Sequence, residues 1–217
     1  MAKITGLHAF MIKEQFRHVF HELGYAFFGL ESKKPWNVNI IGVRAEKHST
    51  NLFDDMLVVI YRNTKKDWEV RTYPITTDPG EWYLENPMNS KGTAILVPGQ
   101  YRSVYKIDLH NGKYEALCQR NGEVCVFRDP NKDNIADTDA ASIASGYFGI
   151  NIHRSRKSGE AEEIDRWSAG CQVFKSASDW KDFMSLMNRS AKYFGNSFTY
   201  SLINEGDILD GTYRRFE

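Results

Sequence analysis

Hydrophobic residues follow a helical period near both ends of the chain. Leu7, Phe10, Phe16 and Phe20 recur at helical spacing across residues 7–23, and a glycine follows as a stop signal. Near the other end, a serine at position 176 can cap an amphipathic helix over residues 177–194. The pattern therefore predicts one helix at each end.

Between these helices the pattern changes to that of β-strands. The apolar run MLVVIYR and the alternating WEVRTYPIT are separated by a polar turn and predict a strand pair. TAILVPGQY, RSVYKIDLH and GYFGINIHRS predict further strands, and KYEALCQ and EVCVFR flank Asn121-Gly122, a pair typical of a two-residue hairpin. Segments 35–44 and 200–203 predict strands outside this central region.

These elements predict a mainly β fold of the α+β class in a single domain, residues 1–217. Within it we expect an N-terminal helical elaboration over residues 1–50 and a catalytic core over residues 54–175. A C-terminal helix and strand would occupy residues 176–217. No repeat, linker or low-complexity tract divides the chain.

Composition narrows the classes of partner. The chain has 28 Lys plus Arg and 28 Asp plus Glu, so no net field favours nucleic acid or anionic lipid. No apolar run reaches the length of a membrane span, and the N-terminus does not resemble a secretory signal. We therefore expect synthesis in the cytoplasm, while the sequence leaves the oligomeric state open. Of the three cysteines, Cys118 and Cys125 are best interpreted as small buried hydrophobes.

The strongest chemical signal is His153 together with Ser168-Ala169-Gly170-Cys171. A cysteine nucleophile needs a base or cation that activates its thiol, and it needs backbone amides that can receive an oxyanion. Gly170 has no side chain to block such amides. A histidine and a cysteine in one chain, taken alone, seldom meet in space.

The order of these motifs resembles the L,D-transpeptidase catalytic domain family. GINIHRS is followed by SAGCQVF with the cysteine 18 positions after the histidine, as in a motif of His, a spacer and Ser/Thr-His-Gly-Cys. Upstream, MLVVIYR, VRTYPITT and VPGQYRSVYKI stand in the family's order. The resemblance covers about residues 54–175.

This resemblance implies a β-rich catalytic domain and a set of catalytic roles. Cys171 would attack a peptide carbonyl and form a thioester, and His153 would hold the thiolate as an ion pair. The backbone carbonyl of Arg154 would orient the imidazole, and the amides of Gly170 and Cys171 would receive the oxyanion. Ser168 would supply a supporting hydrogen bond.

The chain departs from the family pattern at two positions. Ala169 replaces the histidine of Ser-His-Gly-Cys and cannot donate a side-chain hydrogen bond. Gln172 follows the cysteine where the family usually has a hydrophobic residue, and we expect it to contact substrate. Substrate handling should therefore differ from that of the family.

Aromatic and basic residues are candidates for the walls of a substrate cleft. Tyr83 and Trp167 suit a glycan or a stem peptide, although packing is the more common role of an aromatic residue. Arg154 or Arg102 could pair with a substrate carboxylate, and the sequence does not choose between them. His110 has the pattern of an ordinary strand histidine.

An acidic loop gives a weaker metal signal. Asp129, Asn131, Asp133 and Asp137 take the first, third, fifth and ninth positions of a segment resembling a calcium loop. Ala140 stands where such a loop has its bidentate glutamate. A surface turn is the favoured interpretation and structural calcium the alternative, so no cofactor is required.

The sequence thus predicts a cysteine peptidase that cleaves the stem peptides of bacterial peptidoglycan. The missing signal favours an endolysin of bacteriophage type that acts on the cell wall after lysis. Alternatives are a cross-linking L,D-transpeptidase, a cysteine amidase or acyltransferase acting on a small amide, and a non-catalytic wall-binding protein.

Overall fold

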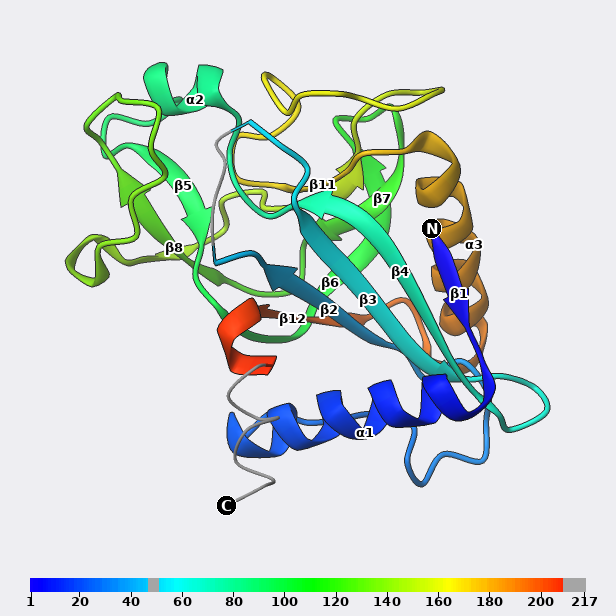
Figure 1. Ribbon diagram of the computed structural model, residues 1–217. Helices are drawn as coiled ribbons and strands as arrows, with labels where there is room; N and C mark the ends of the chain where they lie inside the picture. Colours follow the sequence, from blue (N-terminus) through cyan, green and yellow to red (C-terminus); the bar gives the residue numbers. More distant parts are fainter. Residues whose placement is uncertain (47–50, 209–217) are drawn as a thin grey trace.

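The computed structural model describes residues 1–46 and 51–208 of the chain. In chain order the elements are β1 (Ala2–Ile4), α1 (Gly6–Glu22), β2 (Asn39–Arg44), β3 (Asp55–Arg62), β4 (Trp68–Thr76), α2 (Glu81–Glu85), β5 (Thr93–Leu96), β6 (Gly99–His110), β7 (Tyr114–Gln119), β8 (Val124–Asp129), η1 (Ala140–Ser142), β9 (Ala144–Gly146), β10 (Ile152–Arg154), β11 (Gln172–Phe174), α3 (Ala177–Phe194) and β12 (Phe198–Asn204). The fold is mainly β with helices near both ends (Figure 1), as the hydrophobic pattern predicts.

Eight of the strands close into a barrel. Their order is β4-β11-β10-β7-β6-β12-β2-β3, and pairing of β3 with β4 completes the ring. β1 adds to the outside of β4. Closure removes the free strand edges that an open sheet would expose. β5, β8 and β9 form a separate three-stranded sheet, called the small sheet below.

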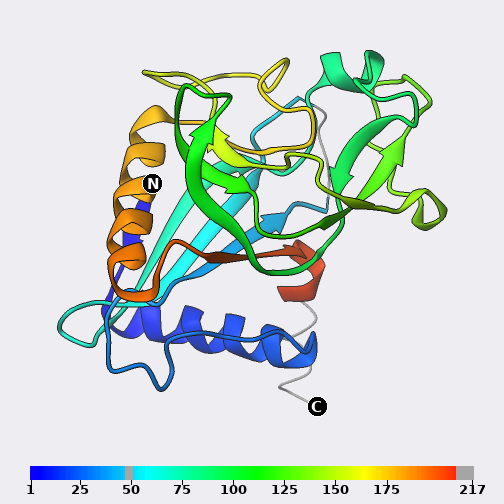
Figure 2. The same cartoon turned by 180° about the vertical axis from the view of Figure 1, so that it is seen from behind.

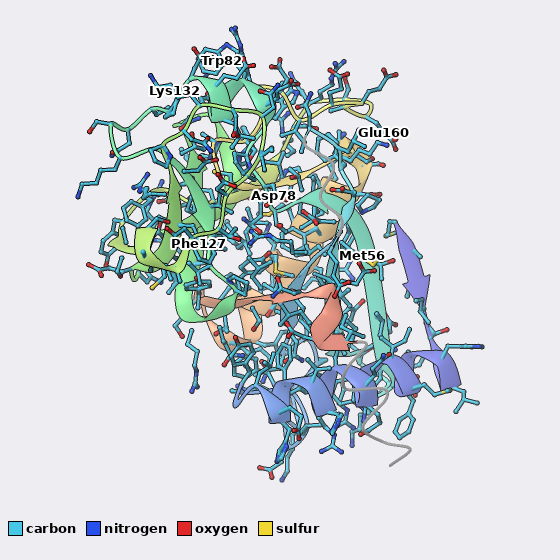
Figure 3. The ribbon with its side chains drawn as sticks, turned by 60° about the vertical axis from the view of Figure 1, so that its left-hand side comes forward. Met56, Asp78, Trp82, Phe127, Lys132 and Glu160 are labelled. Carbon is cyan, nitrogen blue, oxygen red and sulfur yellow. The ribbon has the colours of Figure 1, made fainter. Side chains whose placement is uncertain are left out.

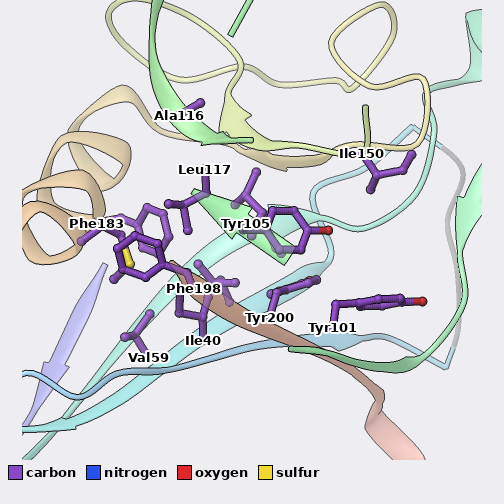
Figure 4. Close-up of a cluster of buried hydrophobic side chains, with 14 of the residues drawn as sticks. Ile40, Val59, Tyr101, Tyr105, Ala116, Leu117, Ile150, Phe183, Phe198 and Tyr200 are labelled. Atoms are coloured by element: carbon purple, nitrogen blue, oxygen red, sulfur yellow. The ribbon is translucent and has the colours of Figure 1, made fainter. Parts of the chain in front are cut away.

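Two hydrophobic clusters hold the helices to the barrel. The larger fills the barrel interior, where Tyr105 and Tyr200 are fully buried, and extends to Phe183 of α3 (Figure 4). The smaller lies under α1, with Phe16 and Phe20 packed among barrel residues. α1 packs on the outer face of the barrel wall that β2, β3, β4 and β12 form, whereas α3 lies beside the barrel and contributes to the interior cluster (Figure 2). Both terminal helices are therefore integral to the packing.

The structure confirms both predicted helices and the β3–β4 hairpin. It contradicts the hairpin predicted around Asn121-Gly122. β7 pairs with β6 and β10 in the barrel, whereas β8 pairs with β5 and β9 in the small sheet. The turn at Asn121-Gly122 therefore connects β7 of the barrel to β8 of the small sheet, because each strand pairs with a segment elsewhere in the chain.

The barrel also extends beyond the predicted core of residues 54–175. β2 lies in the segment predicted as an N-terminal elaboration, and β12 lies in the C-terminal segment. The two nevertheless pair in parallel as neighbouring strands of the barrel. Parallel pairing brings distant segments together, which a local hydrophobic pattern cannot indicate. Among the described residues, no helix is long and apolar enough to cross a membrane. All three cysteines are free.

Candidate functional site

A cleft of about 1170 Å³ lies where the barrel meets the small sheet. The barrel side contributes His110, Tyr114, His153 and Cys171, and the other side includes Ala94 and Arg128 from the small sheet. α2, which carries Trp82, lies at the end of the molecule opposite α1 (Figure 3). The cleft collects five of the predicted site residues, namely Cys171, His153, Arg154, Tyr83 and Trp167.

Parallel pairing of β10 with β11 puts His153 and Cys171 on one face of the barrel wall. The register aligns His153 with Val173 and Ile152 with Gln172. Side chains alternate along a strand, so Cys171, two residues before Val173, points to the same side as His153. The two residues thus meet at one cleft although 17 residues separate them in the chain.

His153 is fixed by a backbone carbonyl. Its Nδ1 lies 2.8 Å from the carbonyl oxygen of Arg154, and the hydroxyl of Tyr114 donates to the same oxygen at 3.3 Å. A carbonyl can only accept, so Nδ1 carries the proton and the other ring nitrogen, Nε2, is left as an acceptor. The contact expected between His153 and the Arg154 carbonyl is confirmed.

The thiol of Cys171 is held by the chain around it. Sγ accepts a hydrogen bond from the backbone amide of Asn151 and donates one to the carbonyl of Gly149, each at 3.4 Å. Within the described residues, Sγ makes no hydrogen bond to His153. Attack would therefore begin with rotation of the thiol away from Gly149.

Burial keeps both groups uncharged at rest. Desolvation raises the pKa of the Cys171 thiol to about 11, although the Asn151 amide opposes this shift. Desolvation and the neighbouring His110 lower the pKa of His153 to about 3. Burial therefore favours a neutral thiol and a neutral imidazole at rest, and the thiolate–imidazolium ion pair stays a prediction.

Ser168 braces the turn that carries the cysteine. It is fully buried, and its hydroxyl donates to the carbonyl of Cys171 at 2.8 Å and accepts from the amide of Gly170 at 3.2 Å. The supporting hydrogen bond predicted for Ser168 is confirmed. The Gly170 amide is thereby occupied, so its expected role in receiving an oxyanion is not supported. The Cys171 amide has no acceptor among the described residues and stays available.

Gly170 serves a different need from the one predicted. Its φ is +111°, a conformation that side chains disfavour, and a Cβ built there would lie 2.1 Å from the carbonyl oxygen of Ala94. Glycine at this position lets β5 of the small sheet touch the loop that carries Cys171.

His110 is the residue that sequence reasoning missed. Its ring stacks on His153 with centroids 4.2 Å apart and planes 22° apart. Its Nδ1 lies 3.2 Å from Nδ2 of Asn151, whose Oδ1 accepts from the amide of Gln119 at 2.9 Å. That second bond fixes the amide, so Nδ2 donates and His110 Nδ1 accepts. Burial lowers the pKa of His110 as well. No local pattern in the sequence marks this contact.

Two of the predicted substrate contacts are wrong. Gln172 has no exposed surface, and its side chain bonds inside the barrel to the hydroxyl of Tyr200 at 2.8 Å. The β10–β11 register turns it away from the cleft. Arg102 is exposed on β6 and does not line the cleft. Arg154 does line it, with its guanidinium 4.1 Å from the centre of the Tyr114 ring.

The side chains of the acidic loop form hydrogen bonds with one another and with the loop backbone. Asn131 Nδ2 donates to Asp133 at 3.0 Å and to Asp137 at 2.7 Å, while buried Asp129 accepts from the Asn131 amide at 3.4 Å. Residues 1–46 and 51–208 contain no group of three or more His, Cys, Asp or Glu placed to hold a metal ion. Calcium binding by this loop stays a prediction.

Comparison of the chain with protein-family models, with curated proteins and with solved structures gives no match.

Proposed function

We propose that this protein is a cysteine peptidase that acts on the stem peptides of peptidoglycan, with Cys171 as nucleophile and His153 as base. One observation carries the proposal. The imidazole of His153 is fixed at Nδ1 by the Arg154 carbonyl, and it lines the same cleft as the Cys171 thiol. A base held by a third group beside a nucleophile is the arrangement that covalent catalysis needs.

The first half-reaction would begin from a neutral pair. Sγ of Cys171 attacks the substrate carbonyl carbon while its proton passes to Nε2 of His153. The resulting imidazolium protonates the departing amine as the carbon–nitrogen bond breaks, which leaves a thioester on Cys171. The Cys171 amide is available to the oxyanion that forms between these steps. Water then hydrolyses the thioester and restores the thiol.

The choice of peptidoglycan rests on the resemblance of the His153 and Cys171 motifs to L,D-transpeptidases and on the shape of the cleft. Trp167 and Tyr83 both line the cleft, and the Trp167 side chain is 41% exposed. Exposed aromatic faces suit an extended substrate that carries sugar and peptide. The cleft volume, about 1170 Å³, exceeds that of a typical small-molecule site.

Digestion of purified sacculi tests this function. We expect the wild-type protein to release peptide fragments detectable by mass spectrometry, and Cys171→Ala to lower the rate on the order of 10⁴-fold or more. Cys125→Ala is the matched control, since Cys125 is also free and does not line the cleft. Digestion in ¹⁸O-water reports the acceptor: one ¹⁸O per new carboxylate indicates hydrolysis, and cross-linked products without it indicate transpeptidation.

Alkylation of the thiol supplies a second test. Because burial raises the pKa of Cys171, its labelling by iodoacetamide should accelerate as the pH rises through the alkaline range. A fast, pH-independent reaction between pH 5 and 8 would instead show a resting thiolate. Equal cleavage by wild type and Cys171→Ala would refute the proposed function.

A further inference from the structure

The charge of the cleft differs from that of the whole chain. Six basic side chains line it, while no aspartate or glutamate among the described residues does: Lys113, Arg120, Arg128, Arg154, Lys157 and Arg166. The chain as a whole is neutral, with 28 basic and 28 acidic residues. A cleft walled by one sign of charge attracts ligands of the opposite sign.

Arg128 differs from the other five basic residues, because one of its guanidinium nitrogens is buried without a partner among the described residues. It lies half-buried on β8, with one Nη donating to the carbonyl of Gly92 at 3.2 Å and its Cζ 4.6 Å from the centre of the Phe148 ring. Its Nε is buried and finds no acceptor within the described residues. No carboxylate there pairs with it, and desolvation lowers its pKa.

Arg120 shows what a satisfied arginine in the same cleft looks like. Its Nε lies 2.9 Å from a carboxylate oxygen of Asp108 and its side chain is 38% exposed, so its charge is met by the protein and by water. Arg128 has neither. Burying an arginine without a counter-charge costs free energy that a bound anion would recover.

Arg128 lines the same cleft as Cys171, and two backbone contacts connect its strand to the loop that carries the cysteine. It is paired with Ala94 in the β5–β8 register, and the carbonyl of Ala94 closely approaches Gly170, which precedes Cys171. The strand spacing of about 4.8 Å, the contact with Gly170 and one further residue add up to about 12 Å, or three to four residues of extended peptide.

We propose that Arg128 binds a free carboxylate of the substrate peptide, within about four residues of the bond that Cys171 attacks. The inference rests on the proposed function of the cleft and adds the feature of the substrate that it selects. A guanidinium can hold a carboxylate through two parallel hydrogen bonds, and the unsatisfied Nε supplies one of the donors. Neutral peptides would lack this contact.

Binding to an inactive protein tests the inference apart from catalysis. In a Cys171→Ala background, calorimetry would compare a stem tetrapeptide with forms in which one carboxyl group at a time is amidated. We expect one amidation to weaken binding about 10–100-fold, as loss of a charge-assisted contact does. Adding Arg128→Gln should abolish that discrimination, and Arg128→Lys should keep part of it.

Arg120→Gln is the matched control and should preserve the discrimination, because Asp108 already holds that guanidinium. Thermal unfolding of each variant checks that it folds. The inference is overturned if Arg128→Gln distinguishes acid from amide as well as the parent does, or if the acid peptide does not bind at millimolar concentration. If sacculi are not cleaved but the Arg128-dependent discrimination is found, the peptidase proposal fails and the carboxylate site stands.

Discussion

The two walls of the cleft are built on different principles. On the barrel wall, His153 and Cys171 are held by backbone groups, and burial leaves both uncharged. On the small-sheet wall, Arg128 has a buried Nε without an acceptor and no carboxylate partner among the described residues. The difference separates two tasks: one wall positions neutral reacting groups, while the other presents a charge for which the ligand is the natural partner.

Contact between the two walls depends on Gly170. The carbonyl of Ala94 on the small sheet approaches the position that a Cβ would occupy, and the backbone there has a φ of +111°. A larger residue at position 170 must therefore move the small-sheet wall relative to the barrel wall. Substitution at this single position should therefore disturb both walls of the cleft.

Gly170→Ala should have the largest effect on the fold. We expect the free energy of unfolding to fall by about 2–5 kcal/mol, because the substitution adds both backbone strain and steric overlap. Peptide cleavage should also be lost, since the loop carrying Cys171 must shift. Urea denaturation measures the first effect and sacculus digestion the second.

Gly159→Ala is a suitable control for Gly170→Ala. Gly159 also has a positive φ, +70°, but a Cβ there would meet nothing within 4 Å. It should lose only about 1 kcal/mol, the cost of the left-handed conformation alone. Equal destabilisation by the two substitutions would show that contact with Ala94 contributes nothing.

The neutral state of the barrel wall predicts a dependence of stability on pH. The pKa of His153 is about 3 in the folded protein and about 6.5 for a histidine in an unfolded chain. Between these values the unfolded state binds more protons, so the contribution of His153 is complete above pH 6.5 and is lost as the pH falls towards 3. His153 alone can add a slope of up to about 1.4 kcal/mol per pH unit.

Urea denaturation between pH 4 and 7 measures this slope. His153→Gln removes the titrating group, so the free energy of unfolding should vary less steeply with pH than in the wild type. The slopes, rather than the absolute stabilities, are compared, because glutamine also changes the hydrogen bond to Arg154. Identical slopes would mean that His153 binds a proton as readily in the folded protein as in the unfolded chain, and the contrast between the two walls would disappear.

The parts of the site that the sequence predicts are those with local signals. The helices at residues 6–22 and 177–194 and the β3–β4 hairpin follow from periodicity and turn chemistry. His153, Ser168 and Cys171 were found because their spacing matches a family motif. Arg154 could be placed because it adjoins His153 in the chain.

The parts that the sequence could not predict depend on pairings between distant segments. β9, β10 and β11 have three residues each, too few to show a period. The orientation of Gln172 depends on the register between β10 and β11, and a shift of one residue would reverse it. The position of Arg128 in the cleft depends on the pairing of β8 with β5 and β9, whereas the sequence predicts a hairpin with β7. The resting charge of Cys171 reflects burial, which a motif does not encode.

The smallest predicted effect concerns His110, which we interpret as a positioning residue on the barrel wall. Its ring stacks on His153, and its Nδ1 accepts a hydrogen bond from the side-chain amide of Asn151. The backbone amide of the same asparagine donates to the Cys171 sulfur. His110→Ala removes both contacts and should lower kcat about tenfold, whereas His110→Phe keeps the stack and should lower it about threefold.

His110 also lowers the pKa of His153, so His110→Ala should raise that pKa, which NMR titration of the His153 ring can follow. A purely structural role would reduce stability without moving this titration. An unchanged kcat together with an unchanged pKa of His153 would remove His110 from the site and leave the barrel wall with His153 and Cys171 alone.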